Sequence, residues 1–410
     1  MVSSPLRETT SAASKRPRNV LVVDGNKAAA YGVKLSRPQI LAAYPITPQT
    51  PLVEYLSQFV ADGELDADMV EVESEHSALS VLHGASLAGA RVFTGTAGQG
   101  LCFMFEPYVR TSSMRLPVVM CLATRETLTP QSVWGGQQDA ILVREAGWLQ
   151  LFVEDNQEIL DTVIMAYKIA EHPDILLPIN VCYDGFYLSH MAERVEIPEQ
   201  AIVDGFLPPY RPTHAALDPD NVMSVDPLTP GDLLMEYRYK HLEAMNRAKG
   251  VIEEVHQEFG RVFGRHYGGL IEGYRMEDAD IAIVAMGSPV GTARVAVDTA
   301  RERGLRIGLV KVKTLRPFPR EALSAALENV RAIGVMDKNV CYGWSSGVVF
   351  MELRAALRDL QSSPPILDFI DGLGGSDITL AHFARAFDLI QAAAEGKAHQ
   401  EVTWLALESD

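Results

Sequence analysis

The sequence of 410 residues contains few cysteines and fewer basic than acidic side chains, and each shortage excludes a class of function. The four cysteines stand apart from one another, without a CxxC pair, at Cys102, Cys121, Cys182 and Cys341. This spacing excludes a self-contained iron–sulfur or structural zinc motif, and reduced thiols in the cytoplasm are the expectation. The formal net charge of −17 argues against a nucleic-acid partner, because nucleic acid is bound by clustered Lys and Arg.

Long apolar runs are also missing, so the chain is not expected to span a membrane. Residues 1–18 are polar and end in basic residues but contain no apolar core, which predicts a disordered N-terminal arm rather than a secretory signal. The hydrophobic fraction of 47% is nevertheless sufficient for a substantial core. A chain of this length is expected to divide into about two or three domains.

Strand-like and helix-like segments alternate through most of the chain, which predicts the α/β class, with two parallel sheets in two domains. We expect the first domain at 19–190, a connector with a long helix at 191–265, the second domain at 270–391 and a polar tail at 392–410. The long helix has apolar residues at helical spacing and is expected to pack across domains or subunits.

In the second domain two glycine-containing turns, Gly287-Ser288 and Gly372–Ser376, follow expected strands. Neither turn matches the full dinucleotide fingerprint or a Walker loop, so nucleotide binding is not expected there. Asp337 and Lys338, at the end of a further strand, are expected to form no more than a local ion pair.

The segment Val70–Leu101 is interpreted as strand, helix, strand, turn and helix. Glu75 then lies where a strand ends and a helix begins, at the carboxyl edge of a parallel sheet, which is where open α/β sheets bind ligands. The alternative is a carboxylate that only interacts favourably with the helix dipole, an effect of about 0.3–1 kcal/mol.

Two more segments reach the same edge of the sheet. In the loop Tyr44–Thr50 two prolines flank Thr47 and fix the backbone that carries its hydroxyl, although a plain turn with a helix-capping Thr47 or Thr50 is the alternative. Arg125 follows a buried strand and could hold a carboxylate through a two-pronged hydrogen bond. An ion pair of Arg125 with Glu126 or with another surface acid is the alternative for that side chain.

Seven short motifs, in their order and spacing, resemble the alpha subunit of the 2-oxoacid:ferredoxin oxidoreductases, of which pyruvate:ferredoxin oxidoreductase is one member. They are DGNKAAAYG, YPITPQT, VESEHSALSVLHGA, FTGTAGQGL, TRE, CYDGF and DGLGGSD, and the likeness runs from Asn19 to about Gln391. The resemblance implies a thiamine-diphosphate-binding domain followed by a domain like the transketolase C-terminal domain.

The resemblance also implies roles for individual residues. Glu75 matches the glutamate that hydrogen-bonds N1′ of the aminopyrimidine, where a carboxylate promotes the proton transfer that generates the reactive carbanion. Thr47 and Arg125 match residues near the substrate, and with Glu75 they would form the catalytic set. The full sets implied are the cofactor-binding residues Glu75, Pro45, Thr96 and Gln99 and the substrate-binding residues Thr47, Arg125, Gly136 and Gln137.

The chain lacks the Gly-Asp-Gly…Asn motif that supplies Mg²⁺ ligands for the diphosphate, so no metal site is expected in this chain itself. Without a cysteine motif it also cannot carry electrons away. We therefore expect half of a thiamine diphosphate site in one subunit of a complex. The resemblance implies a beta subunit with the Mg²⁺ half-site, a gamma subunit associated with CoA, a ferredoxin-like subunit with [4Fe-4S] clusters and, for some members, an NAD-reducing flavoprotein with FAD.

The loop after Trp134 bears on the choice of substrate. Gly135 and Gly136 stand where pyruvate-type subunits tend to carry a larger polar pair, which favours a bulkier acyl group, although two glycines can equally serve loop geometry. The favoured reaction is the one that a resemblance to the aryl-2-oxoacid-oxidising members of this family implies. It is CoA-dependent oxidative decarboxylation of phenylglyoxylate to benzoyl-CoA and CO2, with electrons passed to NAD or ferredoxin. The alternatives are formation of acetyl-CoA from pyruvate, a non-catalytic scaffold subunit and a non-oxidative thiamine enzyme.

Overall fold

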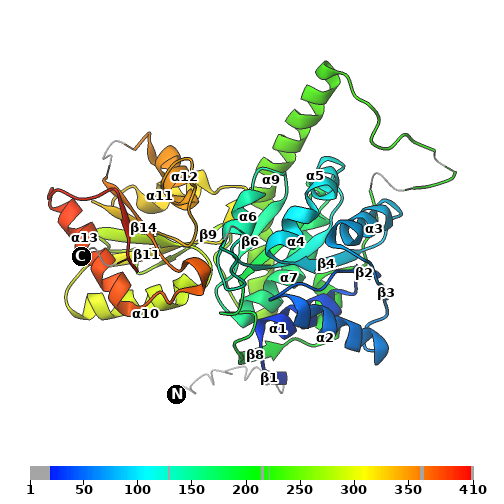
Figure 1. The fold of residues 1–410 in the computed structure, drawn as a ribbon, viewed down its shortest axis with the longest axis horizontal. Helices are drawn as coiled ribbons and strands as arrows, with labels where there is room; N and C mark the ends of the chain where they lie inside the picture. Colours follow the sequence, from blue (N-terminus) through cyan, green and yellow to red (C-terminus); the bar gives the residue numbers. More distant parts are fainter. Residues whose placement is uncertain (1–18, 128–129, 214–216, 221, 361–363, 408–410) are drawn as a thin grey trace, which may run out of the picture.

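The computed structural model describes residues 19–127, 130–213, 217–220, 222–360 and 364–407. The expected N-terminal arm, residues 1–18, lies outside this described part of the chain. Among the described helices, none is long and apolar enough to cross a membrane. The fold class is confirmed, because two α/β domains stand side by side (Figure 1).

The first domain is built on a seven-stranded sheet with the order β12-β6-β7-β5-β4-β2-β3. Strand β12 pairs antiparallel with β6, and the other neighbouring strands pair in parallel. The strands are β2 (Ile40–Ala42), β3 (Asp68–Val70), β4 (Val92–Thr96), β5 (Val119–Thr124), β6 (Leu149–Phe152), β7 (Ile179–Asp184) and β12 (Thr314–Arg316).

Helices cover both faces of this sheet and bury a separate hydrophobic cluster on each. One face carries α1 (Gly25–Ser36), α2 (Thr50–Ala61), α7 (Asn156–Ala170), α8 (Gln200–Phe206) and the second half of α9 (Gly231–Phe263). The other face carries α3 (Glu75–Leu87), α4 (Gly98–Phe103), α5 (Phe105–Ser113) and α6 (Gln138–Leu142). Strand β1 (Asn19–Val23) pairs with β8 (Glu193–Ile197) in a separate two-stranded sheet, so it does not join the parallel sheet.

The second domain is built on a six-stranded sheet with the order β15-β14-β13-β10-β11-β9. Its strands are β9 (Ile271–Tyr274), β10 (Ile281–Ala285), β11 (Ile307–Val312), β13 (Ile333–Asp337), β14 (Ile366–Ile370) and β15 (Val402–Trp404). Its helices are α10 (Pro289–Glu302), α11 (Arg320–Leu327), α12 (Val348–Leu357), the short 3₁₀ turn Leu373–Gly375 and α13 (Leu380–Ala394). Because β15 pairs with β14, this domain includes part of the polar segment 392–410, for which the sequence predicted no structure.

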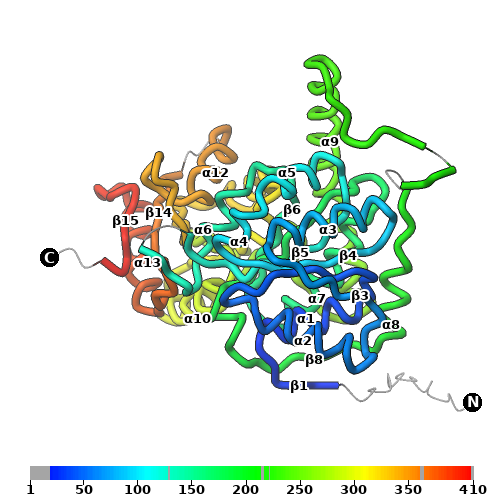
Figure 2. Tube along the Cα trace, turned by 45° about the vertical axis from the view of Figure 1, so that its right-hand side comes forward, coloured from blue at the N-terminus to red at the C-terminus, as the bar shows by residue number. Residues whose placement is uncertain are grey.

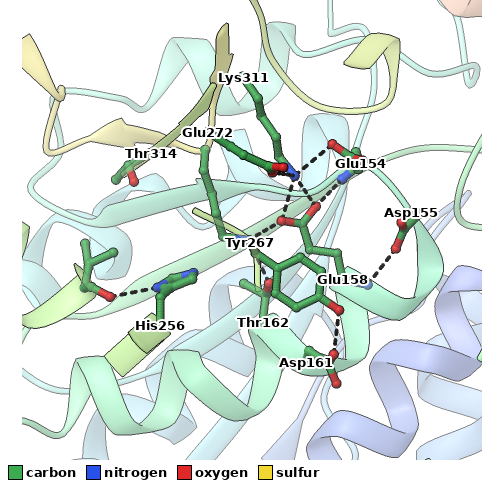
Figure 3. A network of polar contacts seen from close by, with 12 residues as sticks. Glu154, Asp155, Glu158, Asp161, Thr162, His256, Tyr267, Glu272, Lys311 and Thr314 are labelled. Carbon is green, nitrogen blue, oxygen red and sulfur yellow. Dashed lines mark hydrogen bonds and ion pairs between the residues drawn. The ribbon is translucent and has the colours of Figure 1, made fainter. Parts of the chain in front are cut away.

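Two features join the domains. Strand β12 comes from the second half of the chain but completes the edge of the first sheet. In addition, Lys311 of β11 and Lys313 just after it donate to Glu158 of α7, and all three side chains are buried. Figure 3 shows the contact between Lys311 and Glu158. Burial alone would raise the pKa of Glu158, but the two ammonium groups lower it to about 2. A charged cluster therefore fixes the second domain against the first.

Candidate functional site

The topology of the first sheet defines where a ligand should bind. The chain passes from β2 to β3 on one side and then to β4 on the other, so the switch point lies between β2 and β4. Thr47 lies in the loop after β2, Gln99 lies just after β4, and Arg125 follows β5. These three sequence-predicted residues therefore gather at the switch point of one sheet edge.

Glu75 is the first residue of α3, directly after Ser74, whose Oγ accepts a hydrogen bond of 3.2 Å from the Ser77 N–H. This cap leaves the Glu75 carboxylate free to point into the site, and the residue is only 7% exposed. Among the described residues, no hydrogen bond or ion pair reaches that carboxylate. A buried carboxylate of this kind has unused acceptor capacity for a ligand.

The wall of the site opposite Glu75 is made by the turn after β4. A Cβ atom on Gly100 would lie 2.5 Å from Glu75 Oε1 and 2.6 Å from Thr96 Oγ1, so only glycine allows these groups to approach. The Thr96 hydroxyl is fully buried and has no hydrogen-bond partner in the described part of the chain. Glu75 and Thr96 thus form a small polar cradle at the carboxyl edge of the sheet.

Arg125 lies in the same site with 3% of its surface exposed. Its Nη1 donates to the Thr47 carbonyl oxygen at 2.6 Å, its Nη2 donates to Gln99 Oε1, and its Nε is buried without a partner. Burial lowers the pKa of Arg125, whereas the carboxylates of Asp139 and Glu75 raise it. The guanidinium is therefore directed to the loops after β2 and β4, and the ion pair with Glu126 that was the alternative does not form.

The loop that carries Thr47 is hydrogen-bonded to Asn26 of the DGN motif. Asn26 Nδ2 donates to the Pro48 carbonyl oxygen at 3.0 Å, and the hydroxyl of Tyr183 donates to Asn26 Oδ1 at 2.9 Å. Thr47 itself is exposed, as is Pro45. Asn26 thus has a structural role that the sequence analysis did not assign to it.

Asp139 is the main residue of the site that sequence reasoning missed. It is fully buried, and its Oδ2 accepts hydrogen bonds from the backbone N–H groups of Gly98 at 2.8 Å and Arg125 at 3.0 Å. Its Oδ1 accepts from the Ala140 N–H at 2.8 Å. Burial raises the pKa of Asp139 to about 7, although these three hydrogen bonds oppose the increase. No pattern in the sequence marks this aspartate, because its partners are loop amides brought together by the sheet.

Gly136 and Gln137 do not join the cluster around Arg125. The position of a Cβ on Gly136 is filled by the Glu126 carboxylate, and that of a Cβ on Gly135 by the Gly185 carbonyl oxygen. The glycine pair is therefore explained by close packing at both Cβ positions. Gly135 nevertheless lines a cavity of about 370 Å³, together with Trp134 and Phe186. Gln137 is 1% exposed and donates from Nε2 to the Met286 carbonyl oxygen of the second domain at 3.2 Å.

At the neighbouring strand end, Asp184 joins the two domains. Its carboxylate accepts from Thr124 Oγ1 at 3.3 Å, from Lys338 Nζ at 3.1 Å and from the Ser288 hydroxyl. The expectation of a local ion pair between Asp337 and Lys338 is therefore wrong. Asp337 instead accepts from backbone N–H groups in the first turn of α12.

These features define a class: a two-domain α/β protein with a buried acid and a buried guanidinium at the switch point of its first sheet, suited to a cofactor and a carboxylate-bearing ligand. Residues 31–257 match the family described as pyruvate flavodoxin/ferredoxin oxidoreductase, thiamine diphosphate-binding, and residues 279–383 match pyruvate:ferredoxin oxidoreductase core domain II. The chain belongs to the pyruvate:ferredoxin oxidoreductase family, among its alpha-type subunits.

Full-length relatives support this membership. The chain is 49% identical over 413 residues to the alpha subunit of NADH-dependent phenylglyoxylate dehydrogenase from Aromatoleum evansii, covering 99% of both chains. It is 45% identical over 389 residues to pyruvate synthase subunit PorA from Methanothermobacter thermautotrophicus, covering 95% of this chain and 98% of the relative. It is also 44% identical to ketoisovalerate oxidoreductase subunit VorA from Pyrococcus horikoshii over 385 residues, covering 93% and 97%.

A solved structure agrees on the fold. The 2-oxoglutarate:ferredoxin oxidoreductase from Magnetococcus marinus superposes with a TM-score of 0.70 at 19% identity, covering 92% of this chain. The present chain spans 66% of that chain, just under two thirds of its length. At this identity the comparison bears on the fold alone, which it supports for both domains.

Proposed function

We propose that this chain is the alpha subunit of a thiamine-diphosphate-dependent oxidoreductase that converts phenylglyoxylate, CoA and an oxidised electron acceptor into benzoyl-CoA, CO2 and the reduced acceptor. The observation that carries the proposal is the buried Glu75 carboxylate, which has no protein partner among the described residues and faces the switch point beside Thr96. A donor set of one free carboxylate and one free hydroxyl in a glycine-lined cradle fits the polar edge of an aminopyrimidine.

Each residue then has a definite task. When bound, thiamine diphosphate supplies the nucleophilic carbon and the electron sink for decarboxylation. Glu75 holds the proton at N1′ of the aminopyrimidine, and Thr96, Gln99 and Pro45 line the same half of the cofactor site. Arg125 is assigned to the carboxylate that every 2-oxoacid carries, because its guanidinium lies at the switch point between the Thr47 loop and Gln99. Thr47 presents its hydroxyl beside that carboxylate.

The remaining parts of the reaction are assigned to partner chains. The sequence lacks ligands for a diphosphate-bound Mg²⁺ and cysteine motifs for clusters, so both must come from other subunits. We propose a beta subunit with the Mg²⁺ half-site, gamma and ferredoxin-like subunits with [4Fe-4S] clusters, and a flavoprotein with FAD that reduces NAD. The four free cysteines support a reducing, cytoplasmic environment for this assembly.

The aryl substrate is favoured by the phenylglyoxylate relative, which aligns over 99% of both chains. The PorA relatives make pyruvate the second candidate. The glycine pair after Trp134 does not decide between them, since both glycines are required by close packing.

The test is kcat/KM of the purified complex for phenylglyoxylate and for pyruvate, with wild type and Glu75→Gln. Wild type should prefer phenylglyoxylate, and Glu75→Gln should lower turnover with both acids by roughly 10²–10⁴-fold, the usual range for a lost acid–base group. A large preference for pyruvate would reject the aryl assignment and leave the family membership intact. Near-normal turnover of the Glu75→Gln complex would return Glu75 to a structural role at the start of α3.

A further inference from the structure

The carboxyl edge of the second sheet contacts the carboxyl edge of the first. In both views the second domain lies against one side of the first domain (Figures 1 and 2). Its chain passes from β10 to β11 on one side and then to β13 on the other, so the switch point of the second sheet lies between β10 and β13. Ser288 follows β10 and Lys338 follows β13, and both side chains donate to Asp184 at the end of β7. The position where open α/β sheets bind ligands is therefore used here to contact the first domain.

Lys338 is 4% exposed, and its side chain is fixed along its length. A Cβ atom on Gly372, after β14, would lie 3.2 Å from Lys338 Cε, so the stem of Lys338 packs against that turn. Its Nζ lies 5.8 Å from the centre of the Tyr187 ring and donates to Asp184 Oδ2 at 3.1 Å. An ammonium group held in this way can fix the position of the groups around it.

Lys338 acts on two carboxylates of the first domain. Asp184 is in register with Thr124 of β5, whose hydroxyl donates to Asp184 Oδ1 at 3.3 Å. Glu126 lies two residues beyond Thr124; burial raises the pKa of its carboxyl, whereas the Gly374 N–H and the charge of Lys338 lower it. The Lys338 ammonium group thus faces carboxylates at two adjacent strand ends, which would repel each other without it.

The residues held in this way are the two chain neighbours of Arg125. Successive side chains of an extended segment point to opposite sides. Thr124 and Glu126 accordingly face the Asp184–Lys338 pair, whereas the Arg125 guanidinium faces the switch point of the first sheet. A displacement of these two neighbours would therefore move the backbone from which Arg125 extends.

We propose that Lys338 is a positioning residue for Arg125, so that the second domain sets how tightly the first domain binds the carboxylate of a 2-oxoacid. The inference rests on the proposed function, in which Arg125 binds that carboxylate. Lys338 acts through Asp184 and Glu126, which fix the strand end that carries Arg125. The guanidinium is sensitive to such a shift, since a displacement of about 1 Å can cost on the order of 10²-fold in rate.

The first test measures KM and kcat of the purified complex for its 2-oxoacid with wild type, Lys338→Met and Lys338→Arg. Lys338→Met should raise KM by about 10- to 100-fold with a smaller change in kcat, because binding of the carboxylate is impaired. Lys338→Arg keeps the charge and should recover most of the loss. Arg294→Met is the matched control, because Arg294 of α10 also joins the two domains, through Glu154 at 3.2 Å. The control should leave KM unchanged.

A second measurement separates recognition of the carboxylate from general damage to the site. The uncharged amide of the same 2-oxoacid is used as an inhibitor, and its Ki in Lys338→Met should stay close to that of wild type while KM of the acid rises. An equal rise in both constants would indicate a general structural change and overturn the positioning role. If Lys338→Met fails to fold, Thr124→Val removes only the hydroxyl contact with Asp184 and should raise KM in the same direction.

The double variant Arg125→Leu/Lys338→Met tests whether Lys338 acts through Arg125. Its KM should equal that of Arg125→Leu alone, because the guanidinium to be positioned is already absent. Additive losses, or an unchanged KM in Lys338→Met, would overturn the inference and leave the proposed function intact. If Arg125→Leu itself leaves KM unchanged, the proposed role of Arg125 is wrong, and the positioning role of Lys338 is wrong as well.

Discussion

At the scale of single residues, the candidate site depends on a side chain that does not point into it. Asp139 ties the turn that carries Gln99 to the strand end that carries Arg125, through hydrogen bonds to the backbone N–H groups of Gly98 and Arg125. Asp139 thereby positions Gln99 and Arg125, whose side chains are hydrogen-bonded to each other across the site. A small displacement of such groups, about 1 Å, can cost on the order of 10²-fold in rate.

Asp139→Asn replaces one of the two acceptor oxygens by a donor. Either the contact of Oδ1 with the Ala140 N–H or both contacts of Oδ2 with Gly98 and Arg125 must then be lost. We expect kcat/KM for a 2-oxoacid to fall on the order of 10²-fold, mainly through KM, with the fold retained. Asp155→Asn, at the N-cap of α7, is the control because Asp155 contacts neither Gly98 nor Arg125. Equal losses in both variants would indicate general destabilisation and reject the positioning role.

The pH dependence follows from the pKa of about 7 for Asp139 in the folded chain, raised by burial and by the nearby Glu126 carboxylate. As the pH falls through 7, Asp139 takes up a proton, one of its oxygens becomes a donor, and its hold on the amides weakens. The KM of wild type should therefore rise below pH 7, and the KM of Asp139→Asn should not follow it.

The stability of the fold should change with pH in the opposite direction. Ionising the buried Asp139 carboxyl costs free energy, so the contribution of Asp139 to the free energy of unfolding decreases from about pH 4 to pH 7.

At the scale of elements, the cluster around Glu158 shows why strand sequences can mislead. The alternation of Val and Lys at the end of β11 suggests one apolar and one solvated face, yet Lys311 and Lys313 are both buried. Their partner Glu158 is distant in sequence, on a helix of the other domain. Burial lowers the pKa of Lys313, whereas the carboxylates of Glu158 and Glu154 outweigh burial and raise that of Lys311.

Glu158→Gln tests how much this buried ionic cluster contributes to the stability of the fold. Removing one partner from a buried ionic cluster costs about 3–5 kcal/mol, because the ammonium groups remain buried with less compensation. Glu158 has a depressed pKa in the folded chain, so its contribution is present above the pKa of the unfolded chain, about 4.5, and is lost as the pH falls toward 2. Denaturant unfolding at pH 7, 5 and 3 should show this acid loss in wild type and not in the variant. Exposed Glu395→Gln should change neither curve.

At the scale of the whole molecule, the sequence was sufficient to predict two α/β domains, the carboxyl edge of the first sheet and the positions of Glu75, Thr47 and Arg125 on it. Hydrophobic periodicity and strand–turn–helix order are local signals, so they can be recognised in the sequence without knowledge of the fold. The short strands β6, β9, β12 and β15 were missed, because each pairs at or near a sheet edge with a segment distant in sequence. Asp139 and Asp184 were missed for the same reason, since their partners are assembled only by the tertiary structure.

A prediction for the whole chain concerns how it binds thiamine diphosphate without its partner subunits. The described residues include the polar cradle of Glu75 and Thr96, which the proposed function assigns to an aminopyrimidine, and no cluster of three or more potential metal ligands. The isolated chain should therefore bind thiamine diphosphate weakly, and calorimetry should show tight Mg²⁺-dependent binding only after the partner subunits are added. Tight binding by the chain alone would contradict the half-site.

The shared strand β12 also has a consequence during synthesis on the ribosome. The parallel strands of the first sheet are all translated by Asp184, but the strand that covers the edge of β6 comes only at Thr314–Arg316. At translation rates of about 5–20 residues per second, the nascent chain carries an open sheet edge for roughly 6–26 seconds. Such an edge can recruit strands from neighbouring chains. Chaperone binding in that interval would therefore reduce aggregation of this protein more than that of a protein whose first sheet contains only strands from neighbouring segments of the chain.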